Sequence, residues 1–203
     1  MTTSAASSPP PSRPPATGPG RAELIVAGVA VTVGVVLRFV ADSPMWLDEA
    51  LSVNLASLDL GDLPDALRQD GHPPLYYALR HVWMNVFGSG DAAVRALSGV
   101  VGMAAVAVMW TAARRFTGPR AALATTVVVA MSPFAIRYGS EARMYSLVLV
   151  LTGVGLIVFD RARESPTPPR LLLLALVTGI ALLTHYWSLY VVAMVGSALL
   201  VVA

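Results

Sequence analysis

The 203-residue sequence contains no cysteine and no lysine, and only 13% of its residues are charged. The absence of cysteine excludes disulfides, thiolate metal sites and cysteine nucleophiles. An ordinary soluble domain has about 25% charged residues, and a soluble chain of this size needs a polar shell that this composition does not supply. Because 56% of the residues are hydrophobic, the composition predicts an integral membrane protein.

Other absences narrow the function. The net charge is only +2 and no basic run occurs, so the sequence gives no support for a nucleic-acid partner. No P-loop, HExxH, GxSxG or GxGxxG pattern is found, which removes support for the common cytosolic chemistries. The separated acids and the three histidines form no convincing metal set. No cofactor is therefore predicted firmly, and a divalent metal is left open.

The chain divides into a tail and a membrane domain. Residues 1–21 are rich in proline and serine, cannot bury a core, and are expected to form a disordered tail. Residues 22–203 contain six apolar runs, which predict an all-α polytopic membrane protein with about six transmembrane helices. The runs are Leu24–Val40, Val94–Ala113, Ala121–Ala135, Met144–Phe159, Leu171–Leu183 and a last one from Ser188 to the C-terminus.

Arginine placement predicts the orientation. Two short turns are rich in arginine, and the positive-inside rule places both in the cytoplasm together with the N-terminal tail. The outer side then receives the loop 42–91 and the segments 132–143 and 185–188. The arginines of the two turns are Arg114, Arg115 and Arg120 in one and Arg161, Arg163 and Arg170 in the other.

The segment His72–Phe87 looks like a further span, but crossing there would place the arginine-rich turns outside. Its apolar residues recur at i, i+4, i+7, i+8 and i+11, which is one stripe of a helix. We therefore expect an interfacial amphipathic helix that lies on the membrane. Trp46–Ser57 is a second, shorter candidate, so the outer loop 42–91 should carry two interfacial helices.

The acidic pair Asp48 and Glu49 follows shortly after the first span. Adjacent carboxylates on a surface helix are commonly just a solvated face. Here they stand where the chain leaves the bilayer, and a carboxylate in such a place can serve as a general base.

Two histidines also lie on the outer side. His72 precedes Pro73 and Pro74, and paired prolines are an ordinary signal for the start of a helix. This structural interpretation does not account for His72, which could cap the helix, bind a metal or bind an anion. His185 lies beside Tyr186 and Trp187, which are typical of an aromatic belt, and is a weaker candidate.

A third polar cluster runs from Arg137 to Tyr145. A helix that begins near Ser140 would place Glu141 and Tyr145 on one face. Arg137 and Arg143 could hold a phosphate through bidentate hydrogen bonds. The competing interpretation is interfacial anchoring by tyrosine and arginine.

Taken in order, these clusters resemble the GT-C class of membrane glycosyltransferases, and most closely family 39, the relatives of protein O-mannosyltransferases and aminoarabinose transferases. The resemblance covers about Leu24 to the C-terminus. The matching elements are Leu47-Asp48-Glu49, His72-Pro73-Pro74-Leu75-Tyr76-Tyr77, Ala93-Val94-Arg95-Ala96-Leu97-Ser98, Arg114-Arg115-Phe116, Ser140-Glu141-Ala142-Arg143-Met144-Tyr145 and Thr184-His185-Tyr186.

The resemblance implies an inverting enzyme that passes a sugar from a polyprenyl-phosphate donor to an acceptor protein, lipid or glycan at the outer face of the plasma membrane. It implies that Asp48 is the catalytic base and that Glu49 helps to position it. Substrate binding then falls to the remaining candidates, which are His72, Tyr76, Arg137, Tyr138, Glu141, Arg143, Tyr145 and His185.

Length is the departure from that family, whose members have roughly twice as many helices. We therefore expect this chain to be the N-terminal part of a longer enzyme. Two other interpretations stay open from the sequence, namely a truncated non-catalytic membrane protein and a protein that binds or transports lipid phosphates. The absence of an internal repeat disfavours a transporter.

Overall fold

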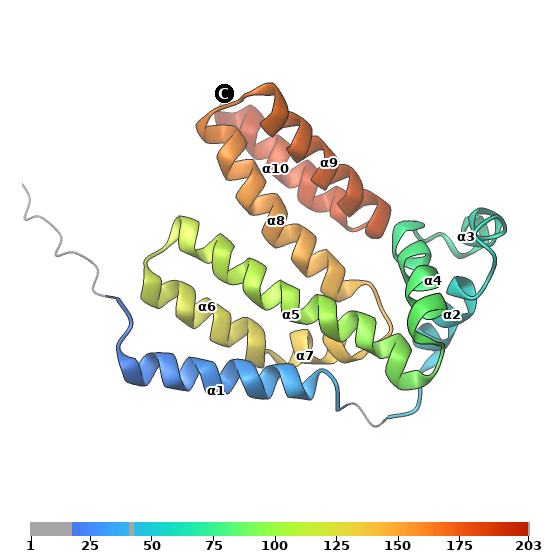
Figure 1. Ribbon diagram of the computed structural model, residues 1–203. Coiled ribbons are helices and arrows are strands. Elements are labelled where there is room, and N and C mark those ends of the chain that lie inside the picture. The colour runs from blue at the N-terminus through green and yellow to red at the C-terminus, as the bar shows by residue number, and fades with distance from the viewer. Residues whose placement is uncertain (1–17, 41–42, 203) are drawn as a thin grey trace, which may run out of the picture.

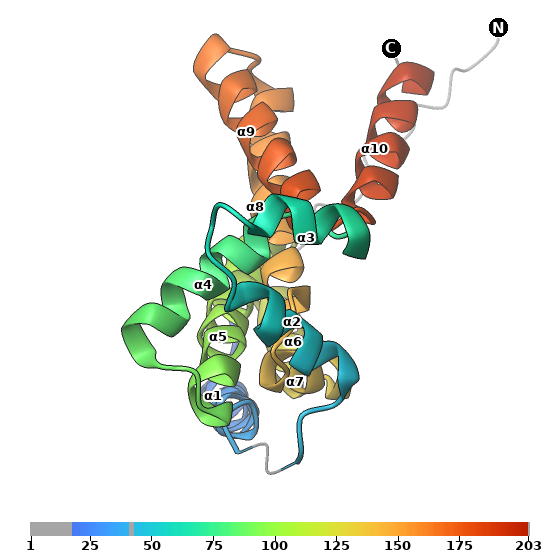
Figure 2. The same cartoon turned by 90° about the vertical axis from the view of Figure 1, so that its right-hand side faces the viewer.

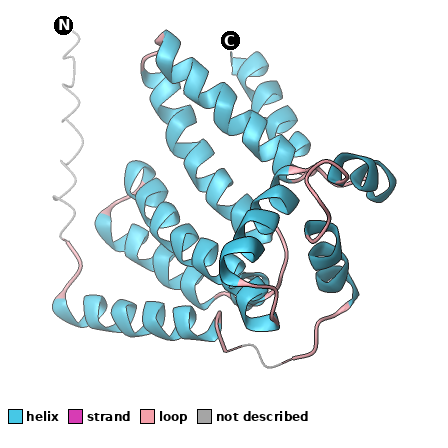
Figure 3. Ribbon diagram, turned by 45° about the vertical axis from the view of Figure 1, so that its right-hand side comes forward, coloured by secondary structure: helices cyan, strands magenta, loops and turns pink. Residues whose placement is uncertain are grey.

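The computed structural model describes residues 18–40 and 43–202, and all regular secondary structure in this part of the chain is helical (Figures 1 and 3). The prediction of an all-α protein is confirmed, while the predicted tail lies outside the described residues up to residue 17. The helices are α1 (Arg21–Leu37), α2 (Leu47–Ala56), α3 (Leu63–Asp70), α4 (Leu75–Phe87), α5 (Asp91–Phe116), α6 (Pro119–Met131), α7 (Pro133–Ser140), α8 (Tyr145–Glu164), α9 (Pro168–Thr184) and α10 (Ser188–Val202).

Helix α5 is the centre of the bundle. It packs against α6 and α7 on one side and α8 on the other, while α1 packs against α6 and α9 packs against α8 (Figure 1). Its first turn carries Asp91 and its last turn carries Arg114 and Arg115, which complement the partial charges at the two helix ends. The short helices α2, α3 and α4 gather at one end of the bundle, and α10 contacts α9 but diverges from it toward the C-terminus (Figure 2).

The predicted count of about six spans has only partial support. Two helices, α5 and α8, are long and apolar enough to cross a membrane, and the bent pair of α6 and α7 makes a third if it is one span. Helix α9, with 17 residues, and the described part of α10 are shorter apolar helices.

The predicted span Ala121–Ala135 is interrupted. Helix α6 ends at Met131, and α7 begins at Pro133 and bends away by 51°. Pro133 has no N–H to continue the α6 ladder, and the Ser132 hydroxyl accepts the Ala135 amide at 3.4 Å as the cap of the new helix. The expected helix start near Ser140 is also wrong, since α7 ends there and α8 begins at Tyr145.

Helix α4 confirms a helix within His72–Phe87, and with 13 residues it is too short to cross a bilayer. Its polar face is turned inward, because Tyr77 and Arg80 are buried against the protein. Its apolar stripe faces outward, with Val82 and Val86 54% and 68% exposed. This is the arrangement expected of a helix whose apolar side rests on a membrane.

Helix α3 was not predicted. Leu63 and Leu67 pack with Leu55 and Tyr77 in a small core that joins α2, α3 and α4. The helix ends at Gly71, whose φ of 81° is the left-handed conformation that glycine favours. The sequence signals for this helix were the spacing of Leu63 and Leu67 by four residues and the glycine at position 71.

Candidate active site

The predicted site residues gather at the end of the bundle where α2 and α4 lie, and the arginine-rich turns lie at the other end (Figure 1). At that far end Arg115 of α5 pairs with Asp160 and Glu164 of α8, at 2.7 and 3.0 Å. Arg120 at the start of α6 pairs with Glu23 of α1 at 3.3 Å. Successive long helices therefore alternate in direction.

Glu49 is a buried carboxylate, 1% exposed, in the first turn of α2. Arg95 of α5 donates from Nε to its Oε1 at 2.9 Å and from Nη2 to its Oε2 at 2.8 Å. The Ala142 amide donates to Oε1 at 2.8 Å. Burial alone would raise the pKa of Glu49, but the hydrogen bonds from Arg95 and Ala142 outweigh it and lower that pKa. The ionised Glu49 thus ties α2 to α5 and to the segment between α7 and α8.

Asp48 lies in a more open environment than its neighbour. Its side chain is 40% exposed, and its Oδ2 lies 3.5 Å from Nη2 of the buried Arg143. Nη1 of Arg143 donates to the Asp48 carbonyl and to the Ser52 hydroxyl, both at 3.2 Å. Ser52 in turn donates to the Asp48 carbonyl at 2.8 Å. The structure thus places an accessible carboxylate beside a cation that the backbone and a hydroxyl hold in position.

A chain of buried side chains also fixes the backbone of Arg143. The Ser98 hydroxyl of α5 donates to the Arg143 carbonyl at 3.1 Å, and the Tyr76 hydroxyl lies 3.4 Å from Ser98 Oγ. Arg80 donates to the Tyr76 hydroxyl and lies over its ring, 4.9 Å from the centroid. Tyr76 is buried, so in this structure it supports Arg143 through Ser98.

Tyr77 is buried, with 1% of its surface exposed, and packs with Leu55, Leu63 and Leu67. Burial, followed by the nearby charge of Asp70, raises the pKa of Tyr77 to about 12. The phenol is therefore neutral at physiological pH. The sequence motif contained both tyrosines, but which of them packs on α2 and α3 depends on the rotation of α4 against α2.

Aromatic and histidine rings connect four parts of the chain. Tyr138 of α7 contacts Tyr145 of α8 at 4.4 Å between centroids, and Tyr145 contacts His185 at 5.8 Å. His185 contacts Tyr186 at 4.8 Å, and Tyr186 contacts His72 at 6.1 Å. The two histidines that were separate candidates in the sequence are therefore members of one cluster.

His185 is buried and its protonation is defined by its contacts. Its Nδ1 accepts the Trp187 amide at 3.1 Å, so the neutral ring carries its proton on Nε2. Burial, and after it the nearby His72 and Arg143, lowers the pKa of His185. The Nδ1 of His72 has a different partner, since it lies 2.6 Å from the carboxylate oxygen Oδ2 of Asp70.

Comparison with known proteins gives one family. The model described as dolichyl-phosphate-mannose-protein mannosyltransferase matches residues 71–203, which is well over half of the chain. The chain belongs to this family. The match confirms the resemblance to GT-C membrane glycosyltransferases. No curated protein and no solved structure matches the chain.

The part that matches the mannosyltransferase family contains His72, Tyr76 and the Arg137–Tyr145 cluster. Asp48 and Glu49 precede it, and they are attached to it by Arg143, Arg95 and Ala142 through the contacts described above. Arg95 and Ser98 are functional candidates to which the sequence patterns assigned no individual role. Arg95 could have been found from the sequence, because it is a charged residue one turn into an apolar helix. No sequence feature distinguished Ser52 from other serines.

Arg137 and Arg143 pair with different carboxylates. Arg137, whose side chain is 66% exposed, donates from Nε to Oε1 of Glu141 at 2.8 Å, whereas Arg143 faces Asp48. The other oxygen of Glu141 is buried without a hydrogen-bond partner among the described residues. The structure therefore does not show the two guanidinium groups converging on one anion.

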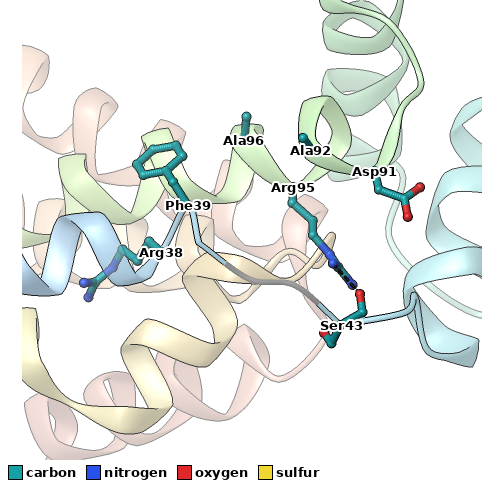
Figure 4. A pocket seen from close by; sticks show the side chains of 7 residues that line it. All are labelled: Arg38, Phe39, Ser43, Asp91, Ala92, Arg95 and Ala96. Atoms are coloured by element: carbon teal, nitrogen blue, oxygen red, sulfur yellow. Dashed lines mark hydrogen bonds between the residues drawn. The ribbon is translucent and has the colours of Figure 1, made fainter.

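A cavity of about 230 Å³ lies beside Arg95 at this end of the bundle (Figure 4). Arg95 donates from Nη1 to the Ser43 carbonyl at 2.8 Å. Arg38 points away toward α6 (Figure 4), where it donates to the carbonyls of Val129 and Ala130 at 3.0 and 2.9 Å. Both guanidinium groups are thus held by backbone acceptors.

The sequence left a divalent metal open. Within residues 18–40 and 43–202, no three or more histidine, aspartate or glutamate side chains gather closely enough to hold a metal ion. The chemically active groups that the described residues bring together are therefore the Asp48 carboxylate, the buried Arg143 guanidinium, and the imidazoles of His72 and His185.

Proposed function

We propose that this chain transfers a sugar from a polyprenyl-phosphate donor to an acceptor hydroxyl of a protein, lipid or glycan at the outer face of the plasma membrane. The observation that carries this proposal is the pair of Asp48 and Arg143, an accessible carboxylate 3.5 Å from a buried guanidinium. The carboxylate can accept a proton and the guanidinium can stabilise a phosphate that leaves.

In the proposed step the acceptor oxygen forms a bond to the anomeric carbon while the bond from that carbon to the phosphate oxygen breaks. The hydroxyl proton passes to Asp48, and the electron pair of the broken bond leaves with the polyprenyl phosphate. Arg143 balances the charge that develops on the phosphate. Because one displacement occurs, the configuration at the anomeric carbon inverts.

The cluster of rings would hold the donor. Neutral His185 has its Nε2–H free of the bond that Nδ1 makes to the Trp187 amide, and it can donate to a phosphate oxygen. His72 lies in the same ring cluster and adds a second imidazole. Tyr138 and Tyr145 supply hydroxyls beside them, Tyr76 supports Arg143, and the pair of Arg137 and Glu141 would bind sugar hydroxyls.

The proposal includes about six membrane crossings. Helices α1 and α9 have 17 residues each, which is ~25 Å at 1.5 Å per residue, a modest mismatch that local thinning and flanking side chains can absorb. The alternating helix directions bring the two arginine-rich turns to one end. The positive-inside rule assigns that end to the cytoplasm and the site to the outer side.

The proposal is tested with the full chain in lipid nanodiscs, mixed with solubilised membrane acceptors. Radiolabelled mannose is offered either as mannosyl-phosphoryl polyprenol or as the sugar nucleotide. Label should enter acceptors from the lipid-linked donor alone. Use of the sugar nucleotide, or binding of the polyprenyl phosphate with no transfer of sugar, would contradict the proposal, and the second result would favour a lipid-phosphate-binding protein.

A further inference from the structure

Arg38 is a buried cation at the C-terminal end of α1, with 2% of its surface exposed. Its Nη1 donates to the Gly34 carbonyl of its own helix at 2.5 Å and to the Ala130 carbonyl of α6 at 2.9 Å. Its Nη2 donates to the Val129 carbonyl of α6 at 3.0 Å. The C-terminal ends of two helices, each with a partial negative charge, thus share one guanidinium group, and Figure 4 shows this group turned toward α6.

The α6 carbonyls that Arg38 binds lie next to the break at Pro133. In a continuous helix the amide of residue 133 would donate to the Val129 carbonyl four residues earlier, and proline has no N–H to do so. The bent pair of α6 and α7 is together long and apolar enough to be one broken span, and lipid offers no hydrogen-bond donor to a free carbonyl. Arg38 supplies donors that the break removes, and it therefore stabilises the 51° bend.

Arg38 also contacts α7 directly. Its side chain lies against Gly102 of α5 and Gly139 of α7, where an added Cβ would come within 3.2 Å of Arg38 Cδ and 2.9 Å of Arg38 Cγ, respectively. The buried Nε faces the same two glycines and has no hydrogen-bond partner among the described residues, so the two Nη groups alone bond to α1 and α6. Arg38 thus meets α7 at the residue that follows Tyr138.

The segment that Arg38 holds carries part of the candidate site. Helix α7 places Tyr138 in the cluster of rings, and the residues that follow α7 bring Arg143 beside Asp48. We propose that Arg38 is a positioning residue for sugar transfer, which fixes the direction in which α7 leaves α6 and thereby the place of Arg143. Arg38 itself contacts no substrate and acts through this segment.

This inference rests on the proposed function and is tested by two measurements on the full chain in nanodiscs. The first is hydrogen exchange of the backbone amides, followed by mass spectrometry. Arg38→Met should speed exchange in residues 133–144 by at least about tenfold, because local opening becomes easier there, and should leave exchange in α9 unchanged.

The second measurement is the kinetics of transfer from mannosyl-phosphoryl polyprenol, with kcat referred to the folded fraction found from unfolding curves. A small misplacement of reacting groups costs up to about 100-fold, so Arg38→Met should lower kcat per folded chain by roughly 10- to 100-fold. The KM for the donor should stay unchanged, since Arg143 acts on charge that develops in the transition state. A residue that only stabilises the fold would leave kcat per folded chain at the wild-type value.

Arg170 provides the matched control. Its guanidinium also donates to backbone carbonyls near the end of a helix, those of Arg161 and Ser165 at 2.9 and 3.3 Å, but at the far end of the bundle. Arg170→Met should therefore leave both exchange in residues 133–144 and kcat at wild-type values. Arg38→Lys keeps the charge but lacks the planar fork that bridges two helices, so it should show the same changes to a smaller degree.

Gly139→Ala repeats the test should Arg38→Met fail to fold. Its Cβ would lie 2.9 Å from Arg38 Cγ and 3.0 Å from Nε, so the Arg38 side chain must shift, while alanine itself favours a helix. Gly179→Ala on α9, where a Cβ meets nothing within 4 Å, is its control and should behave as the wild type.

The outcomes separate the two proposals. Wild-type exchange in residues 133–144 of both Arg38→Met and Gly139→Ala would overturn the role of Arg38, and so would faster exchange in every helix alike. Faster exchange in residues 133–144 with an unchanged kcat per folded chain would overturn it as well. A wild-type chain that transfers no sugar removes the proposed function, and exchange in that same chain then still decides whether Arg38 holds α7.

Discussion

Glu49 and Arg95, 46 residues apart in the sequence, face each other so that both carboxylate oxygens accept hydrogen bonds from one guanidinium. The pair is buried, and Glu49 also accepts the Ala142 amide. Because Asp48 is the residue before Glu49, this pair sets where the exposed carboxylate stands. Glu49 thus fixes the position of the first turn of α2, while the Asp48 carboxylate stays accessible to solvent.

Breaking this pair should destabilise the fold strongly. Glu49→Gln leaves Arg95 as a buried and incompletely paired charge, which typically costs about 3–5 kcal/mol. The double variant Glu49→Gln, Arg95→Met should lose less than the sum of the single variants in thermal unfolding. Arg68→Ala is the control, because Arg68 and Asp65 form an exposed pair with side chains 78% exposed, and it should leave the melting temperature nearly unchanged.

The same pair predicts a loss of stability in acid. The pKa of Glu49 in the folded protein lies below its ordinary value of 4.5, so its contribution is fully present above pH 4.5 and is lost as the pH falls through the lowered value. Unfolding curves collected from pH 7 to pH 3 should show this loss in the wild type. The double variant Glu49→Gln, Arg95→Met should lack it, and an equal acid loss in both proteins would contradict the assignment.

Much of this architecture could be predicted from patterns along the chain. The helical stripe and the arginine positions indicated that His72–Phe87 lies on the surface, and α4 is a helix of 13 residues with an exposed apolar face. Composition and the short motifs led to the family that residues 71–203 match. These features are local, so a single sequence contains them.

Features that depend on packing were not predictable. Arg137, a candidate for holding a phosphate together with Arg143, pairs with Glu141, the residue that directly follows its own short helix. That helix exists because Pro133 breaks α6, and the sequence was interpreted there as a continuous span. Ser52 and Ser98 contact Arg143 only because α2 and α5 lie against the 141–144 segment, and hydroxyls in apolar helices carry no signal of such contacts.

Close packing of α1 on α6 gives a matched pair of glycine variants. A Cβ at Gly34 would overlap the carbonyl oxygen of Ala130 and lie 2.8 Å from its carbonyl carbon, while a Cβ at Gly28 on the same helix meets nothing within 4 Å. Gly34→Ala should therefore lower the melting temperature and the yield of folded protein. Gly28→Ala should match or exceed the wild type, since alanine favours a helix by about 1 kcal/mol. Equal behaviour of the two variants would contradict the packing of α1 on α6.

The lack of cysteine makes orientation directly measurable, because single cysteines can be introduced without removing any. Cysteine at Gly61, in the loop that is proposed to lie outside, should react with a membrane-impermeant maleimide added to intact cells. Cysteine at Ser165, between α8 and α9, should react only after the membrane is permeabilised. The reverse pattern would place the arginine-rich turns outside and contradict the proposed orientation.

The central claim is that Asp48 accepts the proton of the acceptor hydroxyl. The measurement is the rate of sugar transfer from mannosyl-phosphoryl polyprenol by Asp48→Asn, with Asp65→Asn, an exposed acid of α3, as the matched control. Loss of a general base typically costs about 10²–10⁴-fold, so Asp48→Asn should fall by at least about 100-fold while it still inserts into the membrane and Asp65→Asn keeps the wild-type rate. Transfer by Asp48→Asn at the wild-type rate would contradict the account.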